Sequence, residues 1–244
     1  MYKPLSQLER KSENIVLLCT GSSLNDTTDE QWKYLLQQDT LAVNNFVYHP
    51  WIVPKWNHLE IKSYDFPYQQ RYLDLKWLRG WKSVGYIFPE HRADYIASCI
   101  GHTDVAKLYT YKFAKRGDHP KNNPNIKIDA DYNPNVIIHK SYDASMTSII
   151  QILYMMQYKN IIIIGMDMVD SGYFWSDMDI DVHDKWNKAR EGKTKDKPHN
   201  ASHLKDFVID FNNRHMKPKG REIFINTDKT ALYPTLRRWE YESR

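Results

Sequence analysis

The residues able to do chemistry lie where short apolar runs of the chain end. Thr20, Gly21 and Ser22 directly follow the run IVLLC at residues 15–19. A turn of small residues after a buried strand lets the backbone approach a ligand, and N–H groups at the next helix start can receive phosphate oxygens. The turn contains one glycine and matches neither the GxGxxG fingerprint nor the P-loop. It is therefore compatible with nucleotide binding and equally with a structural turn.

Amide and hydroxyl side chains occupy two comparable places further along the chain. Asn44 lies in the second run, LAVNNF at residues 41–46, and Thr147 and Ser148 open an amphipathic segment at residues 145–158. An asparagine amide can both donate to and accept from a base or ribose, and hydroxyls at a helix start suit an anion. A turn asparagine and an ordinary helix cap explain the same residues, so both interpretations stay open.

Asp167 follows the run of isoleucines at residues 161–164 and leads into Tyr173 and Trp175. An aspartate at the end of a central strand can bond a ribose or hold a loop in place. No second carboxylate stands within one or two residues of it, as a DxD metal site would require. We therefore predict no metal at this position.

His199 and His203 are four residues apart, a spacing that places two side chains on one helix face and can bind zinc. Pro198 places His199 before the helix start, which argues against the zinc site. His203 alone suits a general base because the pKa of histidine is near neutrality. A plain surface histidine is the alternative.

The apolar runs lack alternation, as do strands that are buried on both faces of a parallel sheet. They predict strands at residues 15–19, 41–46, 84–88, 161–164 and 222–226, with a short strand near Leu59–Ile61. Helical spacing predicts helices around residues 29–38, 66–82, 93–100, 145–158 and 203–215. The fold class is α/β: one Rossmann-like domain over residues 1–244, with a mostly parallel sheet flanked by helices and a lid at about residues 169–200.

Composition narrows the class of protein. The chain has 244 residues, 41% hydrophobic and 26% charged, with a net charge of +4. Nucleic-acid binding is not expected, because no arginine-rich tract or zinc-finger spacing is present. The two cysteines indicate buried thiols in a reducing compartment, and no apolar leader or membrane span is found. We expect a cytoplasmic protein. Its basic tail, with Arg237, Arg238 and Arg244, is explained either by surface solubility, the more common reason for such charges, or by peripheral contact with the inner face of a membrane.

Taken in order along the chain, these motifs resemble those of a known group of enzymes: the bacterial lipooligosaccharide sialyltransferases, with the related Kdo transferases and motility-accessory-type glycosyltransferases. Those proteins have a strand leading into a Gly-x-Gly-Pro-Ser-Leu turn, where this chain has CTGSSL. They have a strand ending in asparagine and a Thr-Ser helix followed by a Gly-x-Asp strand, as in LAVNNF and MTSIIQILYMMQYKNIIIIGMD. A lid, a His-x-x-x-His pair (HNASH) and a last strand complete the resemblance, which spans roughly residues 14–236.

The resemblance implies a transferase that moves sialic acid or a Kdo-type sugar from a CMP-sugar to a glycan hydroxyl, with inversion and without metal. His203 would be the general base. Val169 and Trp175 stand where the family has tyrosines on the departing phosphate, and Tyr173 is the nearest substitute. We assign nucleotide binding to Thr20, Gly21, Ser22, Asn44 and Asp167. We assign binding of the donor sugar and phosphate to Thr147, Ser148 and Trp175.

The implied partners are a CMP-sugar donor, a glycan or lipid-linked glycan acceptor and further copies of the chain in a homo-oligomer. No cofactor is expected, since the CMP-sugar is a substrate. Two alternatives remain: an enzyme resembling pterin pyrophosphokinases, which would need ATP and magnesium, and a nucleotide-binding module without catalysis. Strand-end asparagines in place of clustered carboxylates count against the first.

Overall fold

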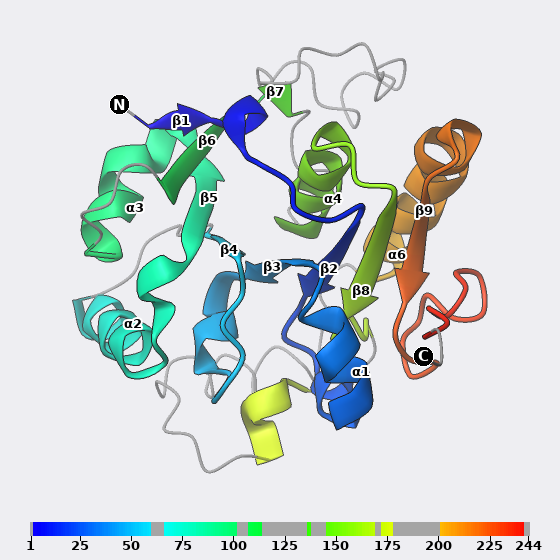
Figure 1. Ribbon diagram of the computed structural model, residues 1–244, viewed down its shortest axis with the longest axis horizontal. Helices are drawn as coiled ribbons and strands as arrows, with labels where there is room; N and C mark the ends of the chain where they lie inside the picture. The colour runs from blue at the N-terminus through cyan, green and yellow to red at the C-terminus, as the bar shows by residue number, and fades with distance from the viewer. Residues whose placement is uncertain are drawn as a thin grey trace.

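The described strands lie side by side in one parallel sheet (Figure 1). The computed structural model describes residues 2–59, 66–101, 107–113, 136–137, 145–168, 172–177 and 201–241. Eight strands run in the order β1-β6-β5-β4-β3-β2-β8-β9, and β7 pairs with β6. Their bounds are Lys3–Pro4 (β1), Asn14–Leu18 (β2), Asp39–Val43 (β3), Trp56–His58 (β4), Gly85–Pro89 (β5), Leu108–Phe113 (β6), Val136–Ile137 (β7), Asn160–Ile164 (β8) and Glu222–Ile225 (β9).

Helices cover both faces of this sheet. They are α1 (Asp29–Leu35), α2 (Phe66–Leu78), α3 (Ala93–Cys99), α4 (Ser145–Met155) and α6 (Ala201–Phe211). Val16 and Ile162 point into a core shared with α1, α2 and α3, whereas Ile15 and Ile161 point into a core shared with α4 and α6. Each central strand is therefore apolar on both faces, which explains its unbroken run of branched residues.

The predicted fold class, a Rossmann-like α/β domain with helices on both faces of its sheet, is confirmed. Every named strand pairing is parallel. The helices α1, α2 and α3 lie in the crossovers from β2 to β3, β4 to β5 and β5 to β6, whereas β3 and β4 are joined through the 3-10 turn Asn44–Tyr48. The lid and the extent of the domain stay predictions, because most of residues 169–200 lie outside the described residues.

Three details differ from the prediction. The second strand ends at Val43, and Asn44–Tyr48 form a 3-10 turn in which Asn44 has a positive φ of 47°. The short strand expected near Leu59–Ile61 lies at Trp56–His58, where it pairs with β3 and β5. Strand β6 was not predicted, since its sequence LYTYKF mixes polar and aromatic residues instead of forming an aliphatic run.

The strands β2, β8 and β9 all point to the same edge of the sheet, below in the view of Figure 1. The 3-10 turn η9 (Phe174–Asp177) lies at that edge, drawn in yellow. The carboxyl ends of parallel strands and the helix starts that follow them form the usual ligand crevice of such sheets. This edge is therefore where the predicted site residues are to be located.

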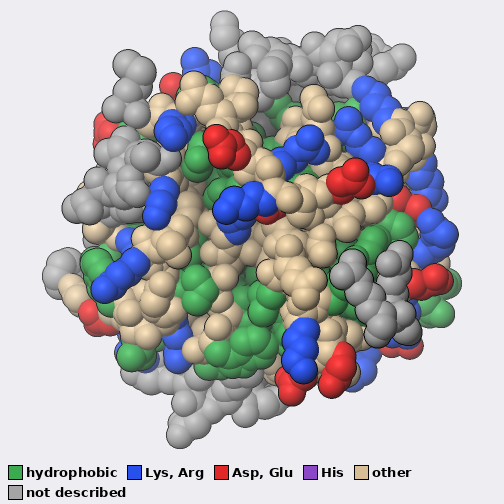
Figure 2. All heavy atoms as spheres, viewed as in Figure 1, with side chains coloured by type: hydrophobic (Ala, Val, Ile, Leu, Met, Phe, Trp, Pro, Cys, Tyr) green, Lys and Arg blue, Asp and Glu red, His purple; other side chains and the backbone are tan. Residues whose placement is uncertain are grey.

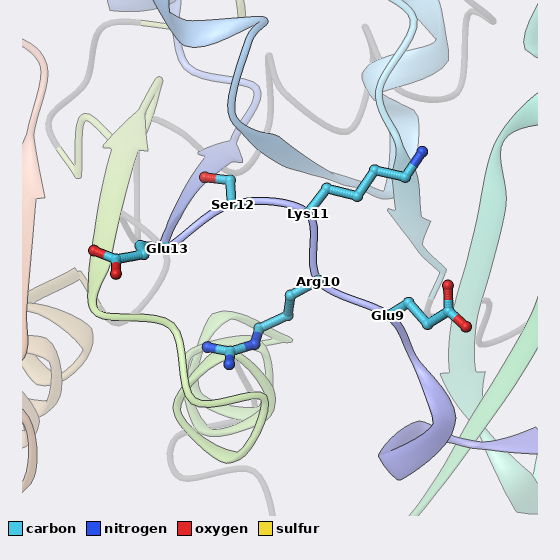
Figure 3. Close-up of a pocket in the computed structure, with 5 residues that line it drawn as sticks. All are labelled: Glu9, Arg10, Lys11, Ser12 and Glu13. Atoms are coloured by element: carbon cyan, nitrogen blue, oxygen red, sulfur yellow. The ribbon is translucent and has the colours of Figure 1, made fainter.

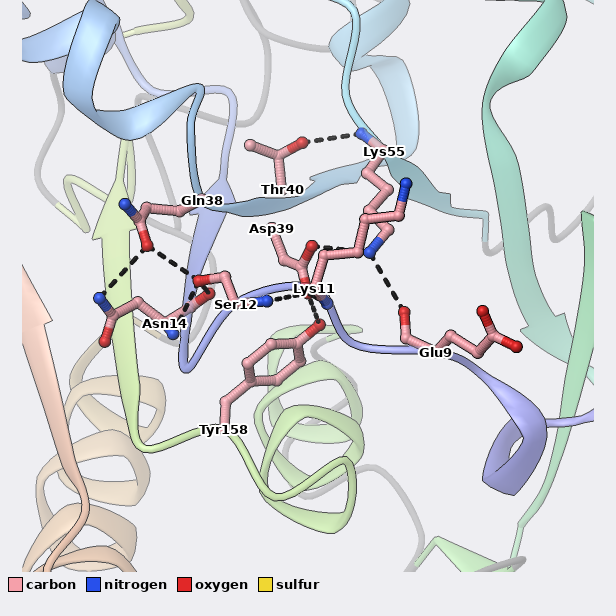
Figure 4. Close-up of polar contacts among 9 residues, drawn as sticks. All are labelled: Glu9, Lys11, Ser12, Asn14, Gln38, Asp39, Thr40, Lys55 and Tyr158. Atoms are coloured by element: carbon pink, nitrogen blue, oxygen red, sulfur yellow. Dashed lines mark hydrogen bonds and ion pairs between the residues drawn. The ribbon is translucent and has the colours of Figure 1, made fainter.

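The opposite, amino edge is held by a buried carboxylate. Asp39, which is 2% exposed, accepts hydrogen bonds from Lys11 N (2.8 Å), Lys55 Nζ (2.7 Å) and the Tyr158 hydroxyl (2.8 Å). Figure 4 shows these groups converging from three segments of the chain. Residues 9–13 line an open hollow next to this cluster, in which Arg10 and Lys11 point in different directions (Figure 3). The cluster joins the chain before β2, the start of β3, the approach to β4 and the end of α4.

Replacing Asp39 by asparagine is expected to lower the free energy of unfolding by about 1–3 kcal/mol, because an amide NH₂ would face donors that need an acceptor. Urea unfolding of Asp39→Asn and wild type measures the difference. Glu13→Gln is the matched control, since its pair with Lys159 is exposed at 3.6 Å and should contribute less than about 1 kcal/mol. Equal losses in the two variants would contradict the anchoring role.

Within the described part of the chain, no helix is long and apolar enough to cross a membrane.

Candidate functional site

The turn after β2 packs directly against the turn after β8. Gly21 N donates to Gly165 O at 2.7 Å, and Cys19 N donates to Ile164 O at 2.8 Å. A Cβ on Gly21 would lie 2.6 Å from Asp167 Oδ2 and 2.7 Å from Gly165 O, so only glycine fits. Gly165, at φ +69°, would place a Cβ 2.9 Å from Cys19 O. The turns after β2 and β8 thus approach each other closely through two glycines, and the approach to a ligand expected of the first turn stays a prediction.

Asp167 holds this turn in shape. Its side chain is 4% exposed and accepts from Ser23 N at 3.0 Å, from the Ser23 hydroxyl and from the Ser22 hydroxyl at 3.4 Å. Of the two roles that the sequence leaves open for Asp167, these contacts correspond to holding a loop. Its assignment as a nucleotide ligand stays a prediction.

The N–H groups of the turn already donate within the protein. Gly21 N donates to Gly165 O, Ser22 N to Gly172 O at 3.2 Å, and Ser23 N to Asp167. A phosphate cannot receive these three hydrogen bonds without displacing a protein acceptor. The half-buried residues Thr20 and Ser22 would then meet a nucleotide through their side chains.

The segment containing Tyr173 lies on the same turn. Phe174 N donates to Thr20 O at 3.0 Å, and Tyr173 forms an antiparallel bridge with Gly21. The Tyr173 ring stacks on Trp175, with centroids 4.5 Å apart and planes 12° apart. Tyr173 is therefore next to the predicted nucleotide turn, as its assignment requires.

Trp175 is turned into the protein. It is 4% exposed, and its ring packs against Tyr48 at 5.3 Å and Phe174 at 4.8 Å between centroids. In this position the Trp175 ring supports the loop beneath the site. The predicted contact of Trp175 with the donor sugar or phosphate stays a prediction.

A buried histidine lies in the same aromatic cluster. His49, 3% exposed, stacks on Phe46 and packs against Phe174, with its Nδ1 accepting from Ile52 N at 3.2 Å. Burial and, less strongly, the positive charge of Arg79 lower the pKa of His49 to about 4. His49 is therefore neutral near pH 7, and its burial and the hydrogen bond that its Nδ1 accepts from Ile52 N give it a structural role in this cluster.

The start of α4 reaches the same edge of the sheet. Met146 Sδ lies 4.0 Å from Cys19 Sγ at the end of β2. Thr147 and Ser148, one and two residues further on, are 0% exposed. Within the described residues the Ser148 hydroxyl has no hydrogen-bond partner, whereas Thr147 has one. A buried hydroxyl without a partner is costly, so Ser148 is the better placed of the two for a ligand.

Asn44 lies at the end of β3 and is linked to a residue that the sequence interpretation missed. Asn57, in β4, donates through Nδ2 to Asn44 O at 3.4 Å and to the Tyr72 hydroxyl at 2.8 Å. Asn57 is 0% exposed, and its Oδ1 accepts nothing from the described residues. An asparagine between Trp56 and His58 in a buried strand was the available signal, and it was hidden in a stretch predicted as mostly loop.

His203 lies in the first turn of α6, and its side chain is not among those described. The end of α6 adjoins the start of β9, since Asn212 Oδ1 accepts from Ile223 N at 2.8 Å. An 11-residue helix spans roughly 16 Å, so the backbone of His203 lies toward the carboxyl edge. His199 and the region of the predicted lid beyond residue 177 lie outside the described residues.

The described residues of the site hold neither a metal-binding cluster nor a reactive thiol. Within the described ranges, no group of three or more His, Cys, Asp or Glu side chains is placed to hold a metal ion. Burial, reinforced by the charge of Asp167, raises the pKa of the Cys19 thiol, so Cys19 is not a nucleophile. Figure 2 shows lysine and arginine side chains spread over the visible face instead of gathered in one patch.

These features define a class: an α/β protein with a Rossmann-like parallel sheet and candidate side chains at its carboxyl edge. No family model matches the chain, and no curated protein matches its sequence. Solved structures do share its fold. The sialyltransferase CstII from Campylobacter jejuni, solved with cytidine-5'-monophosphate, superposes with a TM-score of 0.53 at 12% identity over 95% of this chain and 86% of that one.

Two further CstII structures agree with that result. One, a point variant in complex with CMP, has a TM-score of 0.52 at 15% identity over 91% of this chain and 84% of that one. The other, in complex with a trisaccharide acceptor and CMP, has a TM-score of 0.52 at 13% identity over 92% and 85%. At these identities the likeness establishes the fold.

Proposed function

We propose that this protein is a glycosyltransferase that moves a sialic acid or Kdo-type sugar from a CMP-sugar to the hydroxyl of a glycan acceptor. One observation carries the proposal: the turn at residues 20–22, the strand end at 165–167 and the segment at 172–175 are in direct contact at one edge of the sheet. The shared fold of CMP-bound sialyltransferases supports the choice of nucleotide.

The proposed reaction is a single displacement with inversion. The acceptor oxygen attacks the anomeric carbon, the bond from that carbon to the phosphate oxygen breaks, and CMP leaves with the electron pair. His203 takes the proton of the acceptor hydroxyl. Tyr173, beside Gly21, donates a hydrogen bond to the departing phosphate, a stabilisation of developing charge that needs no metal.

The remaining parts of the proposal follow the same resemblance. Thr20, Ser22 and Asn44 contact the nucleotide, Ser148 binds the sugar carboxylate or the phosphate, and residues 169–200 close over the donor as a lid of a single domain. The acceptor is a glycan or lipid-linked glycan, and the protein works in the cytoplasm as a homo-oligomer at the inner face of the membrane. Arg237 is less available to that membrane than the sequence suggests, since it pairs with Glu222 at 2.5 Å.

A thermal-shift panel of CMP, CDP, UDP, GDP, ADP and ATP tests the nucleotide. At a concentration of 100 times its Kd, CMP adds about 2.7 kcal/mol of stability, which raises the Tm of a domain this size by roughly 5–10 °C. The other nucleotides should shift the Tm less. Stabilisation by ATP only in the presence of magnesium would instead favour the pyrophosphokinase alternative, and CMP binding without any transfer would favour the binding module.

A further inference from the structure

Asn57 places an amide in the middle of a short strand that is otherwise packed on both faces. Its register partners are Ala42 on β3 and Tyr86 on β5, and both point into the core shared with α1, α2 and α3. Asn57 therefore faces α2, where it meets Tyr72, a 4% exposed residue. A buried amide costs free energy unless its donors and its acceptor are all used.

The surroundings of Asn57 fix which way the amide points. Its Nδ2 has two acceptors, the Tyr72 hydroxyl at 2.8 Å and Asn44 O at 3.4 Å. A carbonyl oxygen cannot donate, so a flipped amide would set Oδ1 against Asn44 O. Nδ2 therefore stays on this side, and Oδ1 is left without a donor among the described residues.

The Tyr72 hydroxyl oxygen accepts the hydrogen bond from Asn57 Nδ2 at 2.8 Å. Both residues are almost fully buried, so solvent does not compete for this contact. Tyr72 therefore holds the amide from the side of α2.

We propose that Tyr72 is a positioning residue, which holds the Asn57 amide so that Oδ1 accepts a hydrogen bond from a hydroxyl or amine of the bound CMP-sugar. The inference rests on the proposed function and adds to it a supporting residue on α2. It also accounts for an Oδ1 that accepts nothing from the described residues: the Asn57 amide contacts Asn44 O just beyond the end of β3, where a ligand donor would supply the missing hydrogen bond.

The test is calorimetric titration of CMP-sialic acid into wild type and Tyr72→Phe. Loss of the orienting hydroxyl is expected to weaken binding about tenfold, the equivalent of about 1.4 kcal/mol. In turnover, KM should rise with kcat changed less than about twofold, as for an interaction made equally in the ground state and the transition state. Tyr154→Phe is the matched control: it removes a buried hydroxyl from the core on the other face of the sheet, leaves the contact between Asn57 and Tyr72 in place, and should bind within about twofold of wild type.

A double-mutant cycle with Asn57→Ala separates positioning from general stabilisation. If Tyr72 acts through Asn57, Tyr72→Phe has no further effect on affinity once Asn57 is alanine. A Tyr72→Phe variant that binds like wild type, or one that loses the same factor in both backgrounds, would overturn the positioning role while leaving the proposed function intact. Wild type that does not bind CMP-sialic acid would overturn the proposed function itself.

Discussion

Gly21→Ala is expected to abolish most nucleotide-dependent activity in a protein that still folds. Its new methyl would lie 2.6 Å from Asp167 Oδ2 and 2.7 Å from Gly165 O, and the latter is backbone that cannot rotate away. Overpacking of this kind costs about 1–3 kcal/mol of stability. Since the turn must shift to relieve the contact, and a shift near 1 Å can cost about 100-fold in rate, kcat/KM should fall by about that factor.

Titration of CMP measures the affinity of Gly21→Ala for the nucleotide, and release of CMP from CMP-sialic acid measures kcat/KM. Urea unfolding measures the stability of the variant. Gly220→Ala is the control. Gly220 has a positive φ of +68°, which a residue with a side chain rarely adopts, but a Cβ added there would meet no atom within 4 Å. Gly220 also lies beside β9 at the amino edge of the sheet, away from the candidate site. It should lose about 1–2 kcal/mol of stability from backbone strain and none of its affinity for CMP. A Gly21→Ala protein with normal CMP affinity would remove the turn from the site.

His203→Ala is expected to lower kcat by about 100- to 10,000-fold, the usual contribution of a general base. Binding of CMP should be unchanged, because the base acts on the acceptor and not on the nucleotide. Release of CMP from CMP-sialic acid can be followed with water or with an oligosaccharide as acceptor.

His215→Ala serves as the comparison for that variant. His215 lies beyond the other end of the same helix, where its ring packs on Phe211 with centroids 5.0 Å apart. A defect shared by both histidine variants would reflect damage to α6, whereas a defect confined to His203 supports the base. Transfer by His203→Ala at the wild-type rate would show that another group takes the proton.

The sequence predicts the architecture well because the central strands carry a strong signal. The segments around Val16 and Ile162 are short, aliphatic and unbroken, since both of their faces are covered by helices. The short strand β4 and strand β6 carry no such signal. Trp56, Asn57 and His58 are held in a strand by their neighbours β3 and β5, which is a tertiary effect that no local pattern reports.

The site was predictable in its parts but not in its hydrogen bonding. Strand ends and helix starts identify Gly21, Asn44 and Ser148 as candidates, because parallel topology brings such positions to one edge. The use of the N–H groups at residues 21–23 could not be foreseen, since their acceptors come from Gly165, Asp167 and Gly172 on distant segments. Asn57 and Tyr72 were missed for the same reason: their contact joins a strand to a helix.

The paired glycines have a consequence for how such proteins are compared. Gly21 and Gly165 lie in the turns that follow β2 and β8, far apart in the sequence, and they meet through the hydrogen bond from Gly21 N to Gly165 O. Any method that scans along the chain for a compact signature will pass over this arrangement. Shortening Asp167 would not make room for a larger residue at position 21 either, because the backbone oxygen of Gly165 would still lie 2.7 Å from the added Cβ.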